Sequence, residues 1–281
     1  SKMVAYHKEK EAACTIAVID VPLAEASRFG ILNTNPDDSI YEFDEKPKVP
    51  KSTKASMGIY VFSWNKLKEY LIADEKDKSS SNDFGKNVLP AMLNAGERMF
   101  AYEFQGYWKD VGTIDSLWES NMDLLDPNTT LDLSDENWKI YSRNPVMPPQ
   151  YVGEEAVIQN SLVADGCNVY GNVDFSVLFA GVNVAPGAVV KDSIIMPGAR
   201  VEEGAVVRDS IIMPGTVIKK GAVVEYAIVA ENCVIGEGAV VGQRPENAEN
   251  RDNWGIAVVG NGITIGAGAV VAPKAMIDKD V

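Results

Sequence analysis

Hydrophobic residues recur at a fixed spacing through the C-terminal half of the chain. Residues 191–207 read KDSIIMPGARVEEGAVV and residues 208–224 read RDSIIMPGTVIKKGAVV, with similar 17-residue units on either side. Aliphatic side chains occupy the fifth, eleventh and last positions of each unit. Consecutive aliphatic positions are therefore six, six and five residues apart. Three short strands per turn around an apolar interior produce this spacing. The pattern therefore predicts a parallel β-solenoid over residues 155–281.

Turn residues and one interruption complete this pattern. Glycine follows two of the aliphatic positions by three residues, as at Gly198 and Gly204, and Asn232 replaces glycine in a later unit. Corners that need a positive φ favour these residue types. A polar stretch, 242–256, interrupts the series. Because its charges would be costly inside a Val/Ile core, we expect it to leave the solenoid as a loop, with its role left open.

The single histidine limits what the solenoid can do. Many hexapeptide solenoids transfer acyl groups, and they use a histidine of the solenoid as the general base. The only histidine is His7, far upstream of the first unit. The sequence therefore argues against acyl transfer and favours a structural role for the solenoid.

The first 125 residues alternate between strand-like and helix-like patterns. Such alternation is typical of an α/β layered sheet. The expected strands are 13–21, 56–62 and 99–104, and the expected helices are 64–72, 84–93 and 113–125. Prolines then gather, and the periodic patterns end. We therefore expect an α/β domain over residues 1–125, a linker over 126–154 and the solenoid over 155–281.

Composition narrows the choice of partners. The formal net charge is −14 and the acidic residues are spread along the chain, which argues against a nucleic-acid or anionic-membrane surface. No uncharged apolar run of membrane-spanning length occurs. The three cysteines have no metal-ligand spacing and are expected to be free thiols in a reducing cytoplasm. The N-terminus reads as the middle of a longer chain, without a signal peptide.

Two short segments carry candidate chemistry. Glu45 and Lys46 end a strand directly before Pro47, which is expected to hold Lys46 extended and to stop the strand. The two side chains share one pocket only if the strand bulges or ends there. Asp110 follows an apolar segment and precedes a glycine turn and a helix capped by Thr113, a position suited to holding Mg²⁺ against phosphates. Taken singly, the first segment is better explained as a solvated charged hairpin and the second as a strand–turn–helix cap.

As an ordered set, the motifs resemble the bacterial glucose-1-phosphate adenylyltransferases, also called ADP-glucose pyrophosphorylases. The matching stretches are ASRFGI, YEFDEKP, KASMGIYVF, SNDFGKNVLP, GYWKDVGT and the solenoid. The resemblance implies an α/β fold, with a partial Rossmann-like nucleotidyltransferase domain followed by a left-handed parallel β-helix. It also implies a cytoplasmic enzyme of glycogen biosynthesis that converts ATP and glucose 1-phosphate into ADP-glucose and pyrophosphate. Family members tend to form allosteric homotetramers.

The same resemblance implies roles for five residues. Gly30, Glu45, Lys46 and Ser56 would bind the sugar phosphate, and Asp110 would be a ligand of Mg²⁺. Lys46 and Asp110 would be the catalytic pair, because positioning and charge neutralisation dominate phosphoryl-type transfer.

Part of the family pattern is missing from this chain. The family's glycine-rich, Arg-containing nucleotide loop and a second metal-binding Asp are absent from the sequence. We therefore expect a fragment that holds little of the ATP site and is inactive alone. Three alternatives stay open: a nucleotidyltransferase making another sugar nucleotide such as GDP-mannose, a non-catalytic regulatory paralogue, and a structural scaffold.

Overall fold

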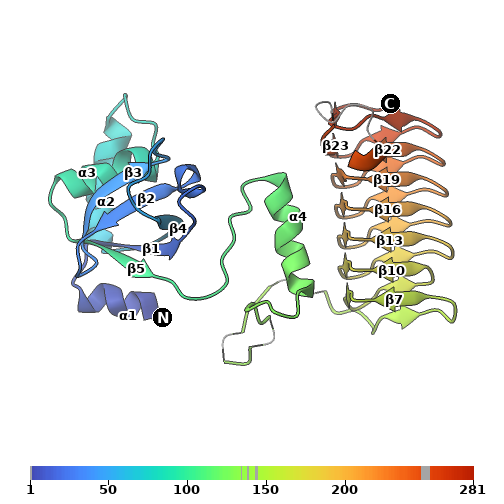
Figure 1. Cartoon of the computed structure of the whole chain (residues 1–281), viewed down its shortest axis with the longest axis horizontal. Coiled ribbons are helices and arrows are strands. Elements are labelled where there is room, and N and C mark those ends of the chain that lie inside the picture. The colour runs from blue at the N-terminus through green and yellow to red at the C-terminus, as the bar shows by residue number, and fades with distance from the viewer. Residues whose placement is uncertain (1, 134, 138, 143–144, 248–253) are drawn as a thin grey trace. The chain divides into compact units, whose positions relative to one another are not determined.

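The computed structural model describes residues 2–133, 135–137, 139–142, 145–247 and 254–281 (Figure 1). The chain divides into two compact units, Ser1–Gly106 and Tyr107–Val281.

The first unit is an α/β layer built on one five-stranded mixed sheet in the order β3-β2-β4-β1-β5. The strands are β1 (Cys14–Asp20), β2 (Gly30–Thr34), β3 (Ile40–Glu45), β4 (Lys54–Phe62) and β5 (Met99–Glu103). The helical elements are α1 (Lys2–Glu9), the 3-10 turn η1 (Ala26–Arg28), α2 (Trp64–Lys76), the π-helical turn η2 (Phe84–Val88) and α3 (Leu89–Asn94). β1 pairs parallel with β5 and antiparallel with β4, and β2 and β3 form an antiparallel hairpin. The α/β class expected from the sequence is confirmed.

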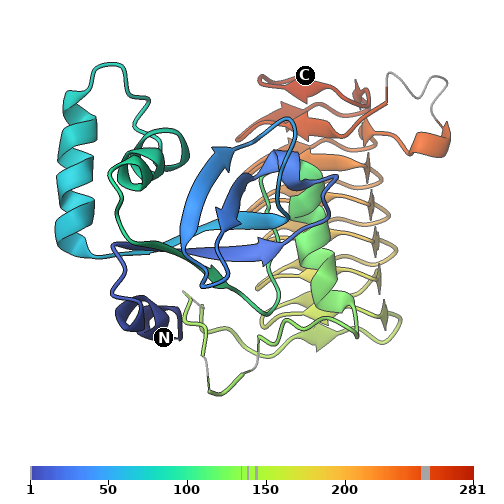
Figure 2. The ribbon, with the colours of Figure 1, turned by 60° about the vertical axis from the view of Figure 1, so that its left-hand side comes forward.

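The core of this unit lies between the sheet and the helices that follow β4. Ile16 and Leu32 of the sheet are fully buried with Leu89 and Met92 of α3, because their apolar faces meet. In Figures 1 and 2, α2 and α3 stand together, and α1 lies apart from them. Burying four such side chains stabilises the unit by about 1.5–3 kcal/mol each.

His7 of α1 contacts two hydroxyl groups near the start of the sheet. It is buried, with Nδ1 2.8 Å from Thr15 Oγ1 and Nε2 3.3 Å from Ser63 Oγ. Burial lowers the pKa of His7 from its ordinary value. The imidazole therefore links α1 to the sheet as a neutral group.

The second unit is a parallel β-helix of seven stacked turns, which confirms the solenoid. Its three faces are seven-stranded parallel sheets. The first face contains β6 (Tyr151–Val152), β9 (Asn168–Val169), β12 (Asn183–Val184), β15 (Arg200–Val201), β18 (Val217–Ile218), β21 (Val234–Ile235) and β24 (Thr264–Ile265). The second contains β7 (Val157–Gln159), β10 (Asn172–Asp174), β13 (Val189–Lys191), β16 (Val206–Arg208), β19 (Val223–Glu225), β22 (Val240–Gly242) and β25 (Val270–Val271). The third contains β8 (Leu162–Val163), β11 (Val177–Leu178), β14 (Ile194–Ile195), β17 (Ile211–Ile212), β20 (Ala227–Val229), β23 (Ala257–Val259) and β26 (Met276–Ile277).

The 17-residue repeat places equivalent residues directly above one another. Val190 pairs with Val207 and Ile195 with Ile212, and all four are fully buried in the interior. The corners expected at Gly198, Gly204 and Asn232 have φ values of 69°, 65° and 56°, which confirms the need for residues that tolerate positive φ.

A ladder of three buried serines, Ser176, Ser193 and Ser210, closes the same corner of successive turns. Each hydroxyl donates to the carbonyl two residues before it, as Ser193 does to Lys191 O at 2.6 Å. The same Ser193 oxygen accepts the amide of Ser210 in the next turn at 3.2 Å, and Ser176 accepts the amide of Ser193 at 3.1 Å. These bonds satisfy amides that the interior would otherwise leave unpaired.

Helix α4 (Ile114–Met122) and the 3-10 turn η3 (Asp123–Leu125) belong to the second unit. Met122 is buried against Ile194 and Ile211 on the outer face of the β-helix, and Leu117 and Trp118 pack beside it.

The structure therefore differs from the domain limits that the sequence predicts. The compact unit that contains the solenoid begins at Tyr107 and not at residue 155, and α4 packs its apolar residues against the β-helix. The first strand of the solenoid, β6, also begins at Tyr151, inside the expected linker 126–154.

The polar insert is partly described. Its first residue, Gly242, ends β22, and a 3-10 turn η4 (Pro245–Asn247) follows. The Trp254 indole donates to Gln243 O at 2.7 Å and packs against Tyr226, so the described ends of the insert lie together. The remainder of the expected loop, 248–253, lies outside the described residues.

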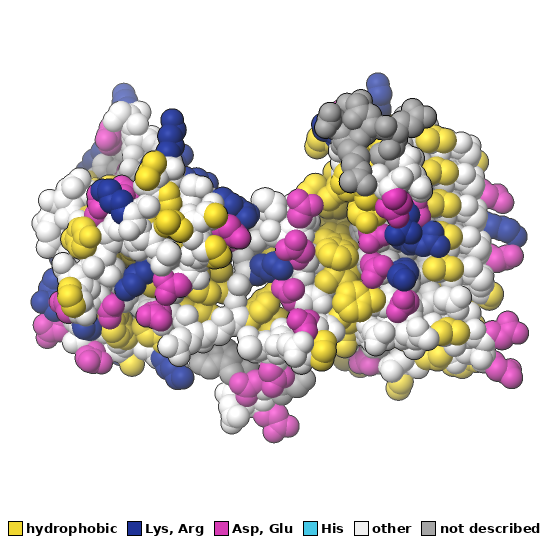
Figure 3. Space-filling model, viewed as in Figure 1, with side chains coloured by type: hydrophobic (Ala, Val, Ile, Leu, Met, Phe, Trp, Pro, Cys, Tyr) yellow, Lys and Arg dark blue, Asp and Glu magenta, His cyan; other side chains and the backbone are white. Residues whose placement is uncertain are grey.

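Charged side chains of both signs are interspersed on the faces visible in Figure 3. Several form cross-turn pairs 17 residues apart, such as Lys219 with Glu202 at 2.9 Å and Arg208 with Glu225 at 3.0 Å. Among the described residues, no helix is both long and apolar enough to cross a bilayer.

Candidate active site

Glu45 and Lys46 lie where β3 ends. Lys46 has a φ of 51°, so it is not extended as the sequence predicts. The preference that Pro47 imposes is overridden here by the turn that ends the strand, and a non-glycine residue with positive φ is a costly conformation found often at functional sites. The turn places both side chains together, with Lys46 Nζ 4.0 Å from Glu45 Oε1. Lys46 is 66% exposed and Glu45 only 26%, which leaves the ammonium open to a ligand.

Gly30 stands directly opposite Glu45 in the β2–β3 hairpin. A Cβ atom at Gly30 would lie 2.6 Å from the Phe43 ring and 3.0 Å from Glu45 Oε2. Only glycine fits here without moving its neighbours, so Gly30 shapes the surroundings of the Glu45 carboxylate.

A second glycine, which the sequence did not mark as a site residue, approaches Glu45 from η2. A Cβ atom at Gly85 would lie 2.6 Å from Glu45 Oε2 and 3.4 Å from Asp83 Oδ1. Asp83 caps this turn, accepting the amide of Lys86 at 2.9 Å. The segment expected only to start a helix therefore also brings a carboxylate and a glycine against Glu45.

Aromatic packing holds η2 over the sheet. Phe84 stacks on Tyr60 with ring centroids 5.7 Å apart, and it packs on Phe62 at the same distance. The pKa of Tyr60 is raised by burial and, to a smaller extent, by the charges of Glu45 and Asp83, while Ser56 opposes the rise. Ile31 pairs with Ala55 and Gly30 with Glu45, so Ser56 lies next to Gly30 in the row of the sheet that also contains Glu45.

Asp110 lies in the second unit, in the segment that leads into α4. Its Oδ1 accepts the amide of Gly112 at 3.1 Å. Thr113 caps α4 by accepting the amide of Ser116 at 3.3 Å, and Asp115 follows in the first turn, as the sequence predicts. The structure thus gathers Gly30, Glu45, Lys46 and Ser56 in the first unit, and the pairing of Asp110 with Lys46 stays a prediction.

The carboxylate of Asp110 can be compared with the ligands that Mg²⁺ commonly takes. Among the described residues, no group of three or more His, Cys, Asp or Glu side chains could hold a metal ion by itself. Mg²⁺ commonly uses one or two carboxylates together with substrate phosphates and water. A single carboxylate such as that of Asp110 would fit that mode if substrate phosphates supplied further ligands.

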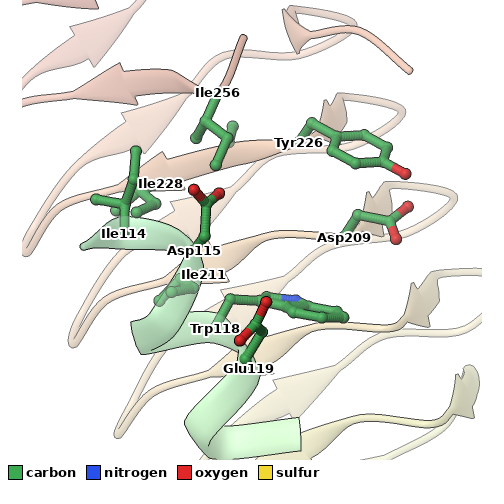
Figure 4. Close-up of a pocket in the computed structure, with 10 residues that line it drawn as sticks. Ile114, Asp115, Trp118, Glu119, Asp209, Ile211, Tyr226, Ile228 and Ile256 are labelled. Carbon is green, nitrogen blue, oxygen red and sulfur yellow. The ribbon is translucent and has the colours of Figure 1, made fainter. Parts of the chain in front are cut away.

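A separate hollow of about 320 Å³ lies between α4 and the third face of the β-helix (Figure 4). Asp115 and Trp118 face it from α4, and Asp209 and Tyr226 face it from the β-helix. Burial, and next the charge of Asp192, raise the pKa of Asp209 to about 6. None of the five residues singled out from the sequence lines this hollow.

Two family models match separate parts of the chain. The family described as "Nucleotidyl transferase" matches residues 1–127, and the family "GlmU-like, C-terminal hexapeptide" matches residues 148–212 and 187–265.

Curated relatives carry the name glucose-1-phosphate adenylyltransferase. That of Clostridium beijerinckii is 62% identical over 194 residues, which are 69% of this chain and 50% of the relative. Those of Clostridium perfringens and Bacillus cereus are 63% and 58% identical, over 69% of this chain and 49% and 52% of their own lengths. The chain thus spans about half the length of the curated relatives it matches. It combines a nucleotidyl transferase domain with a left-handed hexapeptide β-helix, and it is a relative of the glucose-1-phosphate adenylyltransferases.

Proposed function

We propose that this chain forms the sugar-phosphate half of a glucose-1-phosphate adenylyltransferase. The observation that carries the proposal is the convergence of Lys46, Glu45, Gly30 and Gly85 at one strand end, in a chain about 60% identical to enzymes of that name.

The residues of the first unit have complementary tasks in this proposal. The exposed Lys46 ammonium neutralises the phosphate of glucose 1-phosphate, and the Glu45 carboxylate accepts hydrogen bonds from sugar hydroxyls. Gly30 and Gly85 leave the space that this carboxylate occupies. Ser56 offers a further hydroxyl on the same face of the sheet as Glu45.

The reaction joins two substrates in line. An oxygen of the sugar phosphate forms a bond to the α-phosphorus of ATP, and pyrophosphate leaves with the electron pair of the broken bond. Asp110 would hold Mg²⁺, which when bound offsets the negative charge that develops on the phosphates. Lys46 lowers the repulsion between the two anions and fixes the attacking oxygen.

The remaining properties follow from the resemblance. We propose that ADP-glucose synthesis needs a longer polypeptide than this chain, that the enzyme is a homo-oligomer under allosteric control, and that it acts in the cytoplasm. All three cysteines are free and buried, which agrees with a reducing compartment.

Ligand-induced thermal stabilisation tests sugar-phosphate binding. A ligand at a hundred times its Kd stabilises the native state by about 2.7 kcal/mol. Glucose 1-phosphate is expected to raise the Tm of this chain and of the control Lys48→Ala, but not of Lys46→Ala. If no sugar phosphate stabilises the wild type, the proposed site is wrong. In the complete polypeptide, formation of GDP-mannose instead of ADP-glucose would contradict the assigned nucleotide.

A further inference from the structure

The segment that carries Asp110 is tied to the far end of α4. Lys109, the residue before Asp110, places Nζ 3.0 Å from Asp123 Oδ2 and 3.1 Å from Glu119 Oε2. Tyr107 donates its hydroxyl to the same Asp123 oxygen at 2.9 Å. One carboxylate therefore bonds two of the three residues that lead to Asp110.

The charge of the acceptors strengthens these bonds. The Lys109 ammonium lies within 3.1 Å of two carboxylates, and the Tyr107 hydroxyl donates to one of them. A hydrogen bond to a charged acceptor is the stronger kind.

Asp123 is itself held against the β-helix. Asp123 directly follows Met122, which is buried against Ile194 and Ile211. One turn earlier, the Trp118 indole donates to Asp192 O at 2.9 Å. The Asp110 segment is thus held through α4 to the rigid core of the second unit.

We propose that Asp123 is a positioning residue for the candidate reaction. Through Lys109 and Tyr107 it fixes the backbone from which Asp110 presents its carboxylate. The inference rests on the proposed function, in which Asp110 is a ligand of Mg²⁺. Lys109 is engaged by two carboxylates, so it orients the segment and does not bind substrate.

Hydrogen–deuterium exchange tests directly in this chain whether the bonds from Asp123 to Lys109 and Tyr107 hold the Asp110 segment. Asp123→Asn keeps the shape of the side chain and removes the charge. Amides of residues 107–113 are expected to exchange about tenfold faster, equivalent to about 1.4 kcal/mol, while the β-helix interior is unchanged. The matched control is Asp126→Asn, an exposed neighbour whose carboxylate accepts the amide of Asn128 in its own turn. Unchanged exchange at 107–113 would overturn the inference.

The Mg²⁺ dependence of catalysis tests the positioning role in the complete polypeptide. Asp123→Asn is expected to raise the Mg²⁺ concentration at half-maximal rate about tenfold and to leave the KM for glucose 1-phosphate unchanged. Lys109→Arg, which keeps the cation, is expected to behave like the wild type. Faster exchange without a change in Mg²⁺ dependence would overturn the positioning role. A wild type that forms no ADP-glucose at any Mg²⁺ concentration would instead refute the proposed function. In that case the exchange experiment would still show whether Asp123 holds residues 107–113 in place.

Discussion

Replacing Gly85 by alanine perturbs the candidate site without attacking the core. The new Cβ would lie 2.6 Å from Glu45 Oε2, and ordinary van der Waals contact begins at 3.4 Å, so the carboxylate has to move by about 0.8 Å. The obstructing atom is the end of a flexible side chain, so the fold can absorb the change. Alanine is also favoured over glycine in a helical turn by up to ~1 kcal/mol.

The cost is expected in ligand binding and not in stability. A hydrogen bond to a charged group contributes about 1.5–3 kcal/mol. Losing one from Glu45 to a sugar hydroxyl would weaken the binding of glucose 1-phosphate by about 10- to 150-fold. Isothermal titration calorimetry measures this change, and the Tm without ligand should stay constant or rise.

A double-mutant cycle decides whether Glu45 transmits the effect. If Gly85→Ala acts by displacing the carboxylate, it should change affinity little in a Glu45→Ala background, because coupled residues are non-additive. The reasoning is refuted if Gly85→Ala leaves affinity intact while Glu45→Ala lowers it. Equal losses from Gly85→Ala in both backgrounds would also refute it.

Three further predictions concern the second unit. Ser193→Ala removes the acceptor of the Ser210 amide and should lower the unfolding free energy by about 1–3 kcal/mol in urea denaturation, because a buried donor is left unpaired. Trp118→Phe leaves Asp192 O without its indole donor and should lower the same free energy by about 1 kcal/mol. Asp209 has a folded pKa of about 6, above its unfolded value, so its contribution to stability is full below pH 4 and is lost as pH rises through 6. Asp209→Asn should therefore be more stable than wild type at pH 7.5 by about 1 kcal/mol, after discounting for partial exposure, with the difference fading towards pH 4.

Each of these predictions has a matched control. Ser120→Ala removes a hydroxyl that bonds only to its own helix, Trp64→Phe changes a tryptophan that is 66% exposed, and Asp165→Asn changes an exposed aspartate of the β-helix. If the controls lose as much stability as the test variants, the specific hydrogen bonds are not the cause. A pH-independent difference between Asp209→Asn and the wild type would contradict the assigned titration.

The solenoid was predictable because every turn repeats the same spacing of aliphatic residues. The fifth, eleventh and last positions of each unit pair with their own copies above and below, as Val190 pairs with Val207. The serine ladder was not predicted, although Ser193 and Ser210 recur at the same position. Their role depends on the positive φ of the aspartate before each, 48° at Asp192 and 47° at Asp209. The tolerance of Asp for this region was the available signal.

The candidate site was only partly predictable. The resemblance selected Glu45 and Lys46, but local rules placed Lys46 in an extended conformation, because the preference before proline says nothing of how a strand ends. Gly85 was missed because its constraint is a contact with Glu45, forty residues earlier. Likewise, the sequence shows that α4 has an apolar stripe but not that the partner of Met122 lies seventy residues downstream.

The place where the chain divides has a practical consequence for dissecting the molecule. An excised polypeptide ending at residue 125 would keep α4 while discarding the surface that covers it, leaving Leu117, Trp118 and Met122 facing water. Such a truncation is expected to aggregate and to be degraded quickly, whereas one ending at Gly106 omits α4 and so avoids this exposure. Removal of the β-helix up to that junction also removes Asp110, so the unit that contains the solenoid carries part of the proposed chemistry.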